Sequence, residues 1–220
     1  MIVAAMLLMV SGAQQQAQPP VANDPKPAPW REMPGTPDEQ EGQSRRDPRV
    51  TLYGYSACVA QRSRERVSTM LAGDFRTKEY AASMRLVNKV NTDCLRARRM
   101  TLKADGLLAA GAMAEALIEE DKSPLNVRLA RAAALPAPAT YSPTDAGAMC
   151  VVRSVPDDAA KLFATRIASA EEKAAADGLQ PVMTACLRGA RAEISHEGLR
   201  AMLATAAYRS LYAATAGKKS

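Results

Sequence analysis

The chain has 220 residues, 47% of them hydrophobic and 24% charged, and a formal net charge of +6. This length suits one large domain or two small ones, and the apolar fraction is high enough to build a core. Aromatic residues are scarce (six Tyr, two Phe and one Trp) while alanine is abundant. Because Ala loses no side-chain entropy in a helix, this composition favours helices over strands. We therefore predict an all-α fold.

The chain begins with an uninterrupted apolar run, MIVAAMLLMV, followed by the small residues Ser11 and Ala13. The run is shorter than the roughly 20 apolar residues of a membrane span, but it suits a signal peptide. We predict a signal peptide at residues 1–13, a periplasmic or secreted protein, and no transmembrane span after cleavage. No Lys or Arg precedes the run, so either the amino terminus supplies the positive charge or the true start lies upstream. The alternative is an N-terminal core helix, which the following tract would leave without a packing partner.

Residues 14–50 are rich in Pro and Gln, poor in hydrophobic residues and mixed in charge. Such a stretch buries too little apolar surface to offset the entropy lost on ordering. We predict a disordered spacer here, with the folded part beginning at residue 51.

Two stretches of the folded part resemble each other: TDCLRARR begins at Thr92 and TACLRGAR at Thr184, and five of the eight letters agree. The same offset of 92 residues aligns Cys58 with Cys150 and Cys94 with Cys186. It also aligns further pairs, such as Gly106 with Gly198 and Ala112 with Ala204. We infer a duplication, with one helical unit at 51–122, a short helix and linker at 123–146, and a second unit at 147–216.

The four cysteines admit three interpretations. A zinc site favours closely spaced Cys pairs, which the sequence lacks, and a catalytic thiol needs a His, of which the chain has one. Disulfides suit an exported chain with an even number of cysteines. Four cysteines allow three pairings, and duplication selects Cys58 with Cys94 and Cys150 with Cys186. Each unit is then stapled by its own bridge.

Each unit is predicted to contain about three helices, packed as a helical repeat or bundle. In the second unit, Ser169 and Glu172 have the spacing of a helix-starting capping box, and Gly178 is a stop signal. Ser123 begins the short helix between the units.

A basic stripe in the first unit, partly repeated in the second, is the candidate anion-binding surface, suited to lipid phosphates or other envelope polyanions. Its residues are Arg96, Arg99, Lys103, Arg188 and Arg191. The alternative is an ordinary solvated helix face. Few aromatic residues are available for base stacking, and the chain is predicted to be exported, so we expect no nucleic-acid partner.

The remaining candidates have simple structural explanations. His196 is the single histidine, and its sequence neighbours Ser195 and Glu197 point away from it on a helix, so we expect a surface residue. The acidic run Glu119 to Asp121 lacks the alternating oxygen ligands of a calcium loop, and we expect a solvated helix end. The chain contains no P-loop, G-x-G-x-x-G, H-E-x-x-H or G-x-S-x-G motif, and we predict no cofactor, metal site or catalytic residue.

The leader, the Pro-rich spacer and the units YSACV…DCLRARR…GLLAAGAMAEAL together resemble uncharacterised exported helical proteins of α-proteobacteria with a duplicated two-Cys unit. This resemblance implies no activity. Two hypotheses follow from the residues. The first is a non-catalytic envelope protein that binds a partner, such as an anionic envelope component or another envelope protein, or acts as a scaffold through its helical faces. The alternative is a small envelope hydrolase of unfamiliar type. We favour the first, because the sequence carries no recognisable catalytic motif and few aromatic residues that could line a sugar groove.

Overall fold

The computed structural model describes residues 47–96, 106–190 and 192–216, and within these ranges the chain forms helices joined by turns, with no strand. The prediction of an all-α fold is confirmed. The predicted signal peptide lies outside the described residues, as does the predicted spacer up to residue 46.

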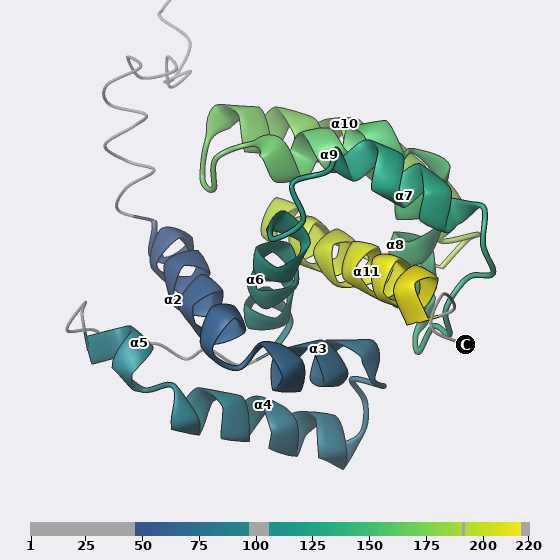
Figure 1. Ribbon diagram of the computed structural model, residues 1–220. Helices are drawn as coiled ribbons and strands as arrows, with labels where there is room; N and C mark the ends of the chain where they lie inside the picture. Colours follow the sequence, from purple (N-terminus) through teal and green to yellow (C-terminus); the bar gives the residue numbers. More distant parts are fainter. Residues whose placement is uncertain (1–46, 97–105, 191, 217–220) are drawn as a thin grey trace, which may run out of the picture. The chain divides into compact units, whose positions relative to one another are not determined.

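Helices α2 to α6 come from the first half of the folded part, α7 from the connection, and α8 to α11 from the second half (Figure 1). Their bounds are α2 Pro48–Arg62, α3 Arg64–Ala72, α4 Lys78–Val90, α5 Asp93–Arg96, α6 Gly106–Glu119, α7 Leu125–Ala133, α8 Pro143–Ser154, α9 Pro156–Ala164, α10 Ala170–Cys186 and α11 His196–Ala216.

Helices α2 and α8 begin in the same way, with a capping side chain followed by proline. The Asp47 carboxylate accepts a hydrogen bond from the Arg49 N–H (2.7 Å), and the Ser142 hydroxyl accepts one from the Asp145 N–H (3.1 Å). Proline suits the next position because the first N–H groups of a helix have no partner within it. Helices α2 and α8 therefore start at Pro48 and Pro143, ahead of residues 51 and 147, where the two predicted units begin.

The helices are more numerous than the predicted three per unit, because breaks interrupt two of the longer segments. Helix α8 ends before Pro156, whose ring disfavours a helical conformation at Val155 (φ −132°, ψ 62°). The corresponding break after α2 is at Ser63, whose hydroxyl accepts a hydrogen bond from the Asn91 amide (2.8 Å). In contrast, α10 starts at the predicted Ser169 cap but continues through Gly178 to Cys186.

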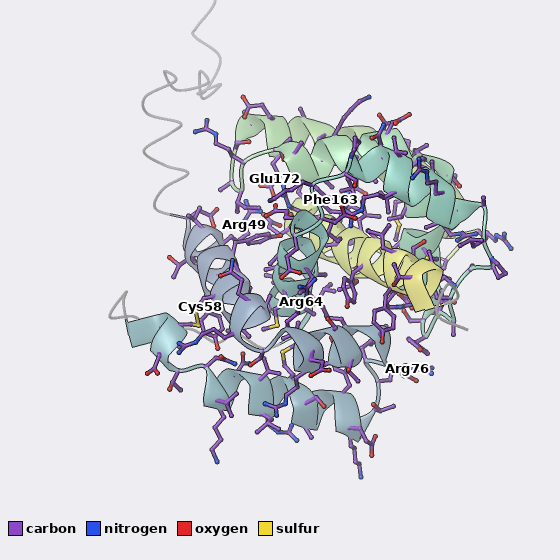
Figure 2. The ribbon with its side chains drawn as sticks, in the orientation of Figure 1. Arg49, Cys58, Arg64, Arg76, Phe163 and Glu172 are labelled. Carbon is purple, nitrogen blue, oxygen red and sulfur yellow. A yellow bond between two sulfur atoms is a disulfide. The ribbon has the colours of Figure 1, made fainter. Side chains whose placement is uncertain are left out.

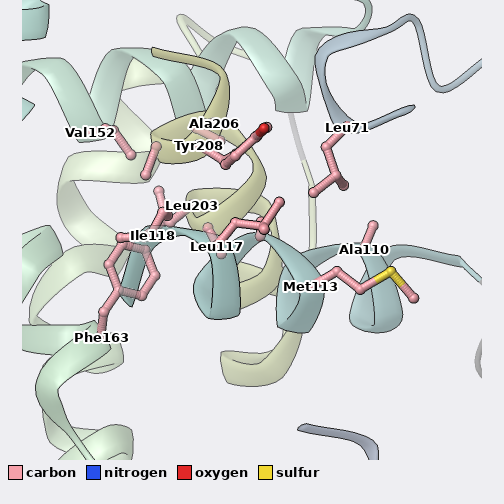
Figure 3. Packing of buried hydrophobic residues seen from close by; sticks show 14 of the residues in the cluster. Leu71, Ala110, Met113, Leu117, Ile118, Val152, Phe163, Leu203, Ala206 and Tyr208 are labelled. Atoms are coloured by element: carbon pink, nitrogen blue, oxygen red, sulfur yellow. The ribbon is translucent and has the colours of Figure 1, made fainter. Parts of the chain in front are cut away.

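Helices α6 and α11 cross at the centre of the described core (Figure 1). Most of α6 is buried, as expected for a helix that is apolar on nearly all sides. Met113 and Leu117 of α6 pack in the same cluster as Leu203 of α11, with Phe163 of α9 beside them (Figure 3). A Cβ atom at Gly111 would lie 2.5 Å from the Cα atom of Ala201, so the two backbones approach as closely as glycine allows.

Two disulfides form, Cys58–Cys94 and Cys150–Cys186, with Cα–Cα distances of 5.9 and 5.8 Å. This is the predicted pairing, and it is confirmed. The first bridge links α2 to α5, and the second links α8 to the end of α10. Each bridge therefore ties the outer helices of its half to the helix that packs on the core.

The Gly111 contact predicts opposite effects for the same change at two helical glycines. Gly111→Ala should lower the free energy of unfolding by about 1–3 kcal/mol, because the added methyl group overpacks the crossing. Gly178→Ala should raise it by about 0.5–1 kcal/mol, because a Cβ there meets no atom within 4 Å and alanine is the better helix former. Urea denaturation of both variants measures the difference. Equal effects at the two sites would contradict the close approach of α6 and α11.

Candidate functional site

The predicted anion-binding residues are mostly not described. Arg99, Lys103 and Arg191 lie outside the described residues, and so does the side chain of Arg96. Arg188 is exposed in the turn after α10, with a left-handed backbone (φ 50°). The predicted surface therefore remains a prediction.

Helix α4, which leads toward that predicted surface, carries a second basic set that the sequence reading did not single out. Lys78, Arg85 and Lys89 are all exposed, and none forms an ion pair with a residue that the structure describes. At 3.6 residues per turn they lie within about 40° of one another around the helix axis, so they form one stripe. Thr77 caps the helix, its hydroxyl accepting a hydrogen bond from the Tyr80 N–H (3.1 Å).

Two large apolar side chains lie beside the α4 stripe, both on the same side of it. Leu86 and Val90 are 44% and 52% exposed, while Met84 and Val87, on the opposite side, are buried in the core. Helix α4 packs mainly on α3, so its outer side is open to solvent. We call Lys78, Arg85, Leu86, Lys89 and Val90 the α4 face. Cations beside exposed apolar groups are the pattern of a helix that lies on an anionic interface.

In the sequence alignment with an offset of 92 residues, α4 matches α10, which lacks this chemistry. The positions that match Lys78, Arg85 and Lys89 are occupied by Ala170, Asp177 and Pro181. Gly178 stands in place of Leu86, and Val182, in place of Val90, is partly buried against the core. The α4 face is therefore a property of one half of the molecule rather than of the helical scaffold.

A buried network of charged side chains surrounds Arg200 of α11. The guanidinium donates to both carboxylate oxygens of Glu115 (Nε to Oε1 2.9 Å, Nη2 to Oε2 2.7 Å). Its Nη1 also donates to the hydroxyl of Thr165 (2.9 Å). Arg49 of α2 meets Glu172 of α10 at 3.1 Å, and Figure 2 shows these two side chains pointing toward each other. Two positive and two negative groups thus neutralise one another across α2, α6, α10 and α11.

Tyr53 completes the network by donating its hydroxyl to Glu115 (2.8 Å). Burial, followed by the negative charge of Glu115, raises the pKa of Tyr53 far above its usual value, so the hydroxyl stays a proton donor. Burial also raises the pKa of Glu115, against the opposing effects of Arg200 and Tyr53. The charged groups at the centre are all paired, which is the arrangement of a structural network rather than of a reactive site.

A second buried ion pair joins α8 and α11. Arg209 donates to Asp145 (2.7 Å) and to the carbonyl of Ala139, and Asp145 accepts a second bond from the Tyr141 N–H (2.8 Å). Two guanidinium groups lie over the Tyr141 ring, that of Arg209 at 5.0 Å and that of Arg76 at 5.6 Å from the ring centroid. These contacts fix the segment that leads into α8.

His196 and the acidic run both take part in surface contacts. His196 lies 2.7 Å from Asp177, while the hydroxyl of Ser195 is occupied in accepting the Gly198 N–H (3.1 Å). His196 thus has a carboxylate partner, but its neighbouring hydroxyl serves as a helix cap.

The acidic run also forms ion pairs: Asp121 pairs with Arg128 (3.1 Å) and Glu120 with Arg64 (2.5 Å). Neither group favours the hydrolase hypothesis.

The chain was compared with protein-family models, with curated proteins and with solved structures, and none of the three comparisons finds a match. Residue roles therefore have to be argued from the geometry of this chain.

Sequence reasoning missed the buried network, although one signal for it was present. Glu115 stands alone in the apolar stretch GLLAAGAMAEALI, and an acid in a helix that is otherwise buried requires a cationic partner. The sequence does not say which of the chain's 29 Lys and Arg residues that partner is. Arg200 is 85 residues away, and only packing of α6 on α11 brings them together.

The network predicts a large effect for removing its central cation. Arg200→Met should lower the free energy of unfolding by about 3–5 kcal/mol, because Glu115 would lose its cationic partner and be left as a buried, uncompensated charge. Lys161→Met is the control, since Lys161 forms an exposed ion pair with Asp158, and the change should lower the free energy of unfolding by less than about 1 kcal/mol. Thermal and urea unfolding measure both. Similar losses for the two variants would show that Arg200 is not the centre of a buried network.

Proposed function

We propose that this chain is an exported, non-catalytic binding module that contacts an anionic envelope surface through the α4 face. The observation that carries the proposal is the coincidence of three exposed cations without ion partners in the described chain and two exposed apolar side chains on one helix. The cations suit lipid phosphates, and Leu86 and Val90 suit the boundary between head groups and acyl chains.

The proposal includes a duplicated architecture, which several features support. The bounds of α3, shifted by 92 residues, coincide with those of α9 (Pro156–Ala164), and both disulfides close a separation of 36 residues. Equivalent helices also pack in equivalent pairs: α2 on α6 as α8 on α11, and α3 on α4 as α9 on α10. In a duplicated protein, one copy can retain a structural role while the other acquires a binding surface, which accounts for the difference between α4 and α10.

Export is part of the proposal as well. Disulfides persist in oxidising compartments, and both bridges form here, which supports the predicted signal peptide. Among the described residues, no helix is both long and apolar enough to cross a bilayer.

The α4 face predicts salt-sensitive binding to anionic vesicles. Replacing Lys78, Arg85 and Lys89 together by Gln should weaken binding roughly a hundredfold at low salt, because each basic residue near such a surface contributes about 1 kcal/mol. The wild-type affinity should fall as salt is raised, whereas neutral vesicles should bind weakly at any salt. Co-sedimentation with vesicles containing an anionic phospholipid measures both effects.

A charge-matched variant separates the α4 face from net charge. Lys122, Arg131 and Lys173 are exposed cations on other helices and turns. Replacing these three by Gln should leave binding within a factor of about three, since they lie outside the face. If both triple variants lost the same vesicle affinity, net charge alone would explain the binding, and α4 would be excluded as the docking surface.

Export predicts a processed amino terminus. Expression of the full sequence in an α-proteobacterium should yield periplasmic or secreted protein that begins near Gln14. A chain lacking residues 1–13 should stay in the cytoplasm with reduced cysteines. Intact-mass analysis and thiol labelling measure both properties, and exported protein that retains Met1 would contradict the signal-peptide prediction.

A further inference from the structure

A cavity of about 260 Å³ lies between the two halves of the described chain. Its walls come from the end of α3 and the turn that follows it, and from α4, α6, α8 and α11. The apolar part of its lining consists of Leu71, Phe75, Tyr80, Leu107, Ala110 and Met202. Phe75 and Leu107 are 41% and 43% exposed, so they stand at the opening, while Leu71 and Ala110 are buried in the core behind them.

The polar end of this cavity carries no net charge. Asp145 and Arg209 both line it, and they neutralise each other in the buried ion pair (2.7 Å). Burial raises the pKa of Tyr80 to about 12, so its hydroxyl is uncharged at neutral pH. The hydroxyl of Thr205 donates to the Met202 carbonyl (2.9 Å) and is therefore occupied. A charged ligand group inside would find no unpaired counter-charge in this lining and would lose its hydration.

We propose that this cavity binds the acyl chain of a single-chain amphiphile, a medium-chain fatty acid or a lysolipid, with the polar head group left in water at the opening. The aliphatic lining matches a hydrocarbon chain, and the neutral polar end excludes a buried ionised group. The volume exceeds the roughly 150 Å³ that accepts benzene and lies just below the roughly 300–1,000 Å³ typical of pockets for drug-sized ligands. A chain of medium length matches this size.

The proposed ligand would also cover the exposed apolar side chains at the opening of the cavity. Phe75 packs edge-on against Tyr141, with ring centroids 5.9 Å apart, so it is held in place at the rim. An acyl chain entering past Phe75 and Leu107 would cover both side chains and remove apolar surface from water. The head group would then lie near Arg76, whose guanidinium is exposed and stacks over Tyr141.

Binding of saturated fatty acids of increasing length to the full chain tests the proposal. Titration calorimetry, below the micelle concentration of each acid, should show one site. Its affinity should rise about fourfold per added methylene and level off once the cavity is filled. Lysophospholipids with the same chains form the second arm, and the tighter of the two series identifies the natural head group. Absence of binding in both series, or an affinity independent of chain length, overturns the proposal.

Variants of two threonines on α11 test whether the ligand binds in the cavity. Thr205 lines the cavity, whereas Thr215 is exposed further along the helix, and each hydroxyl donates to the carbonyl three residues before it. Thr205→Met should lower acyl-chain affinity at least tenfold by filling the space, and Thr215→Met should leave it unchanged. If Thr205→Met does not fold, Ala110→Leu is a second variant that should fill the cavity. If neither variant folds, the chain-length series with the wild-type protein tests the proposal. Equal affinities in the folded variants would place the ligand elsewhere and overturn the proposal, whatever the result of vesicle binding through α4.

Discussion

At the crossing of α6 and α11 the two backbones are separated by little more than a glycine hydrogen, and the buried pair Glu115–Arg200 joins the same two helices a turn away. The close approach of α6 to α11 and the pairing of Glu115 with Arg200 depend on each other. If the helices moved apart, Glu115 would lose its partner in a region without water, which costs several kcal/mol. Helices from both halves pack on this crossing, α2 and α3 from the first and α8 to α10 from the second, so its geometry determines how the two halves are placed.

The disulfides stabilise the outer helices of each half, which lie away from the crossing. Helix α4 packs mainly on α3 and buries little more than Met84 and Val87, so it contributes little hydrophobic stabilisation of its own. The Cys58–Cys94 bridge ties α5, which directly follows α4, back to α2. A helix held in this way does not need to bury its second side, which leaves Leu86 and Val90 exposed and available for a partner.

The α4 face and the cavity differ in how their charges are arranged, so they are suited to different parts of a ligand. The α4 face presents cations that have no acidic partner in the described chain, so an anionic surface is its natural complement. The cavity between the halves has its charges paired, so it suits hydrocarbon. A protein that docks on a lipid surface and holds a single acyl chain would use both properties, yet each rests on its own residues and is tested by its own variants.

The sequence by itself determined the helical class, the cysteine pairing and the start of α10. Alanine content, the equal spacing of the two Cys pairs and the capping side chain of Ser169 can all be interpreted without knowing which helices meet. Local signals were insufficient where packing decides: α10 runs on through Gly178 because Leu179 and Met183 bury their side chains in the core beyond it. The partner of Glu115, the exposure of the α4 face and the cavity beside Arg209 depend on which helices meet. Those contacts join residues far apart in the chain, and only the tertiary structure brings them together.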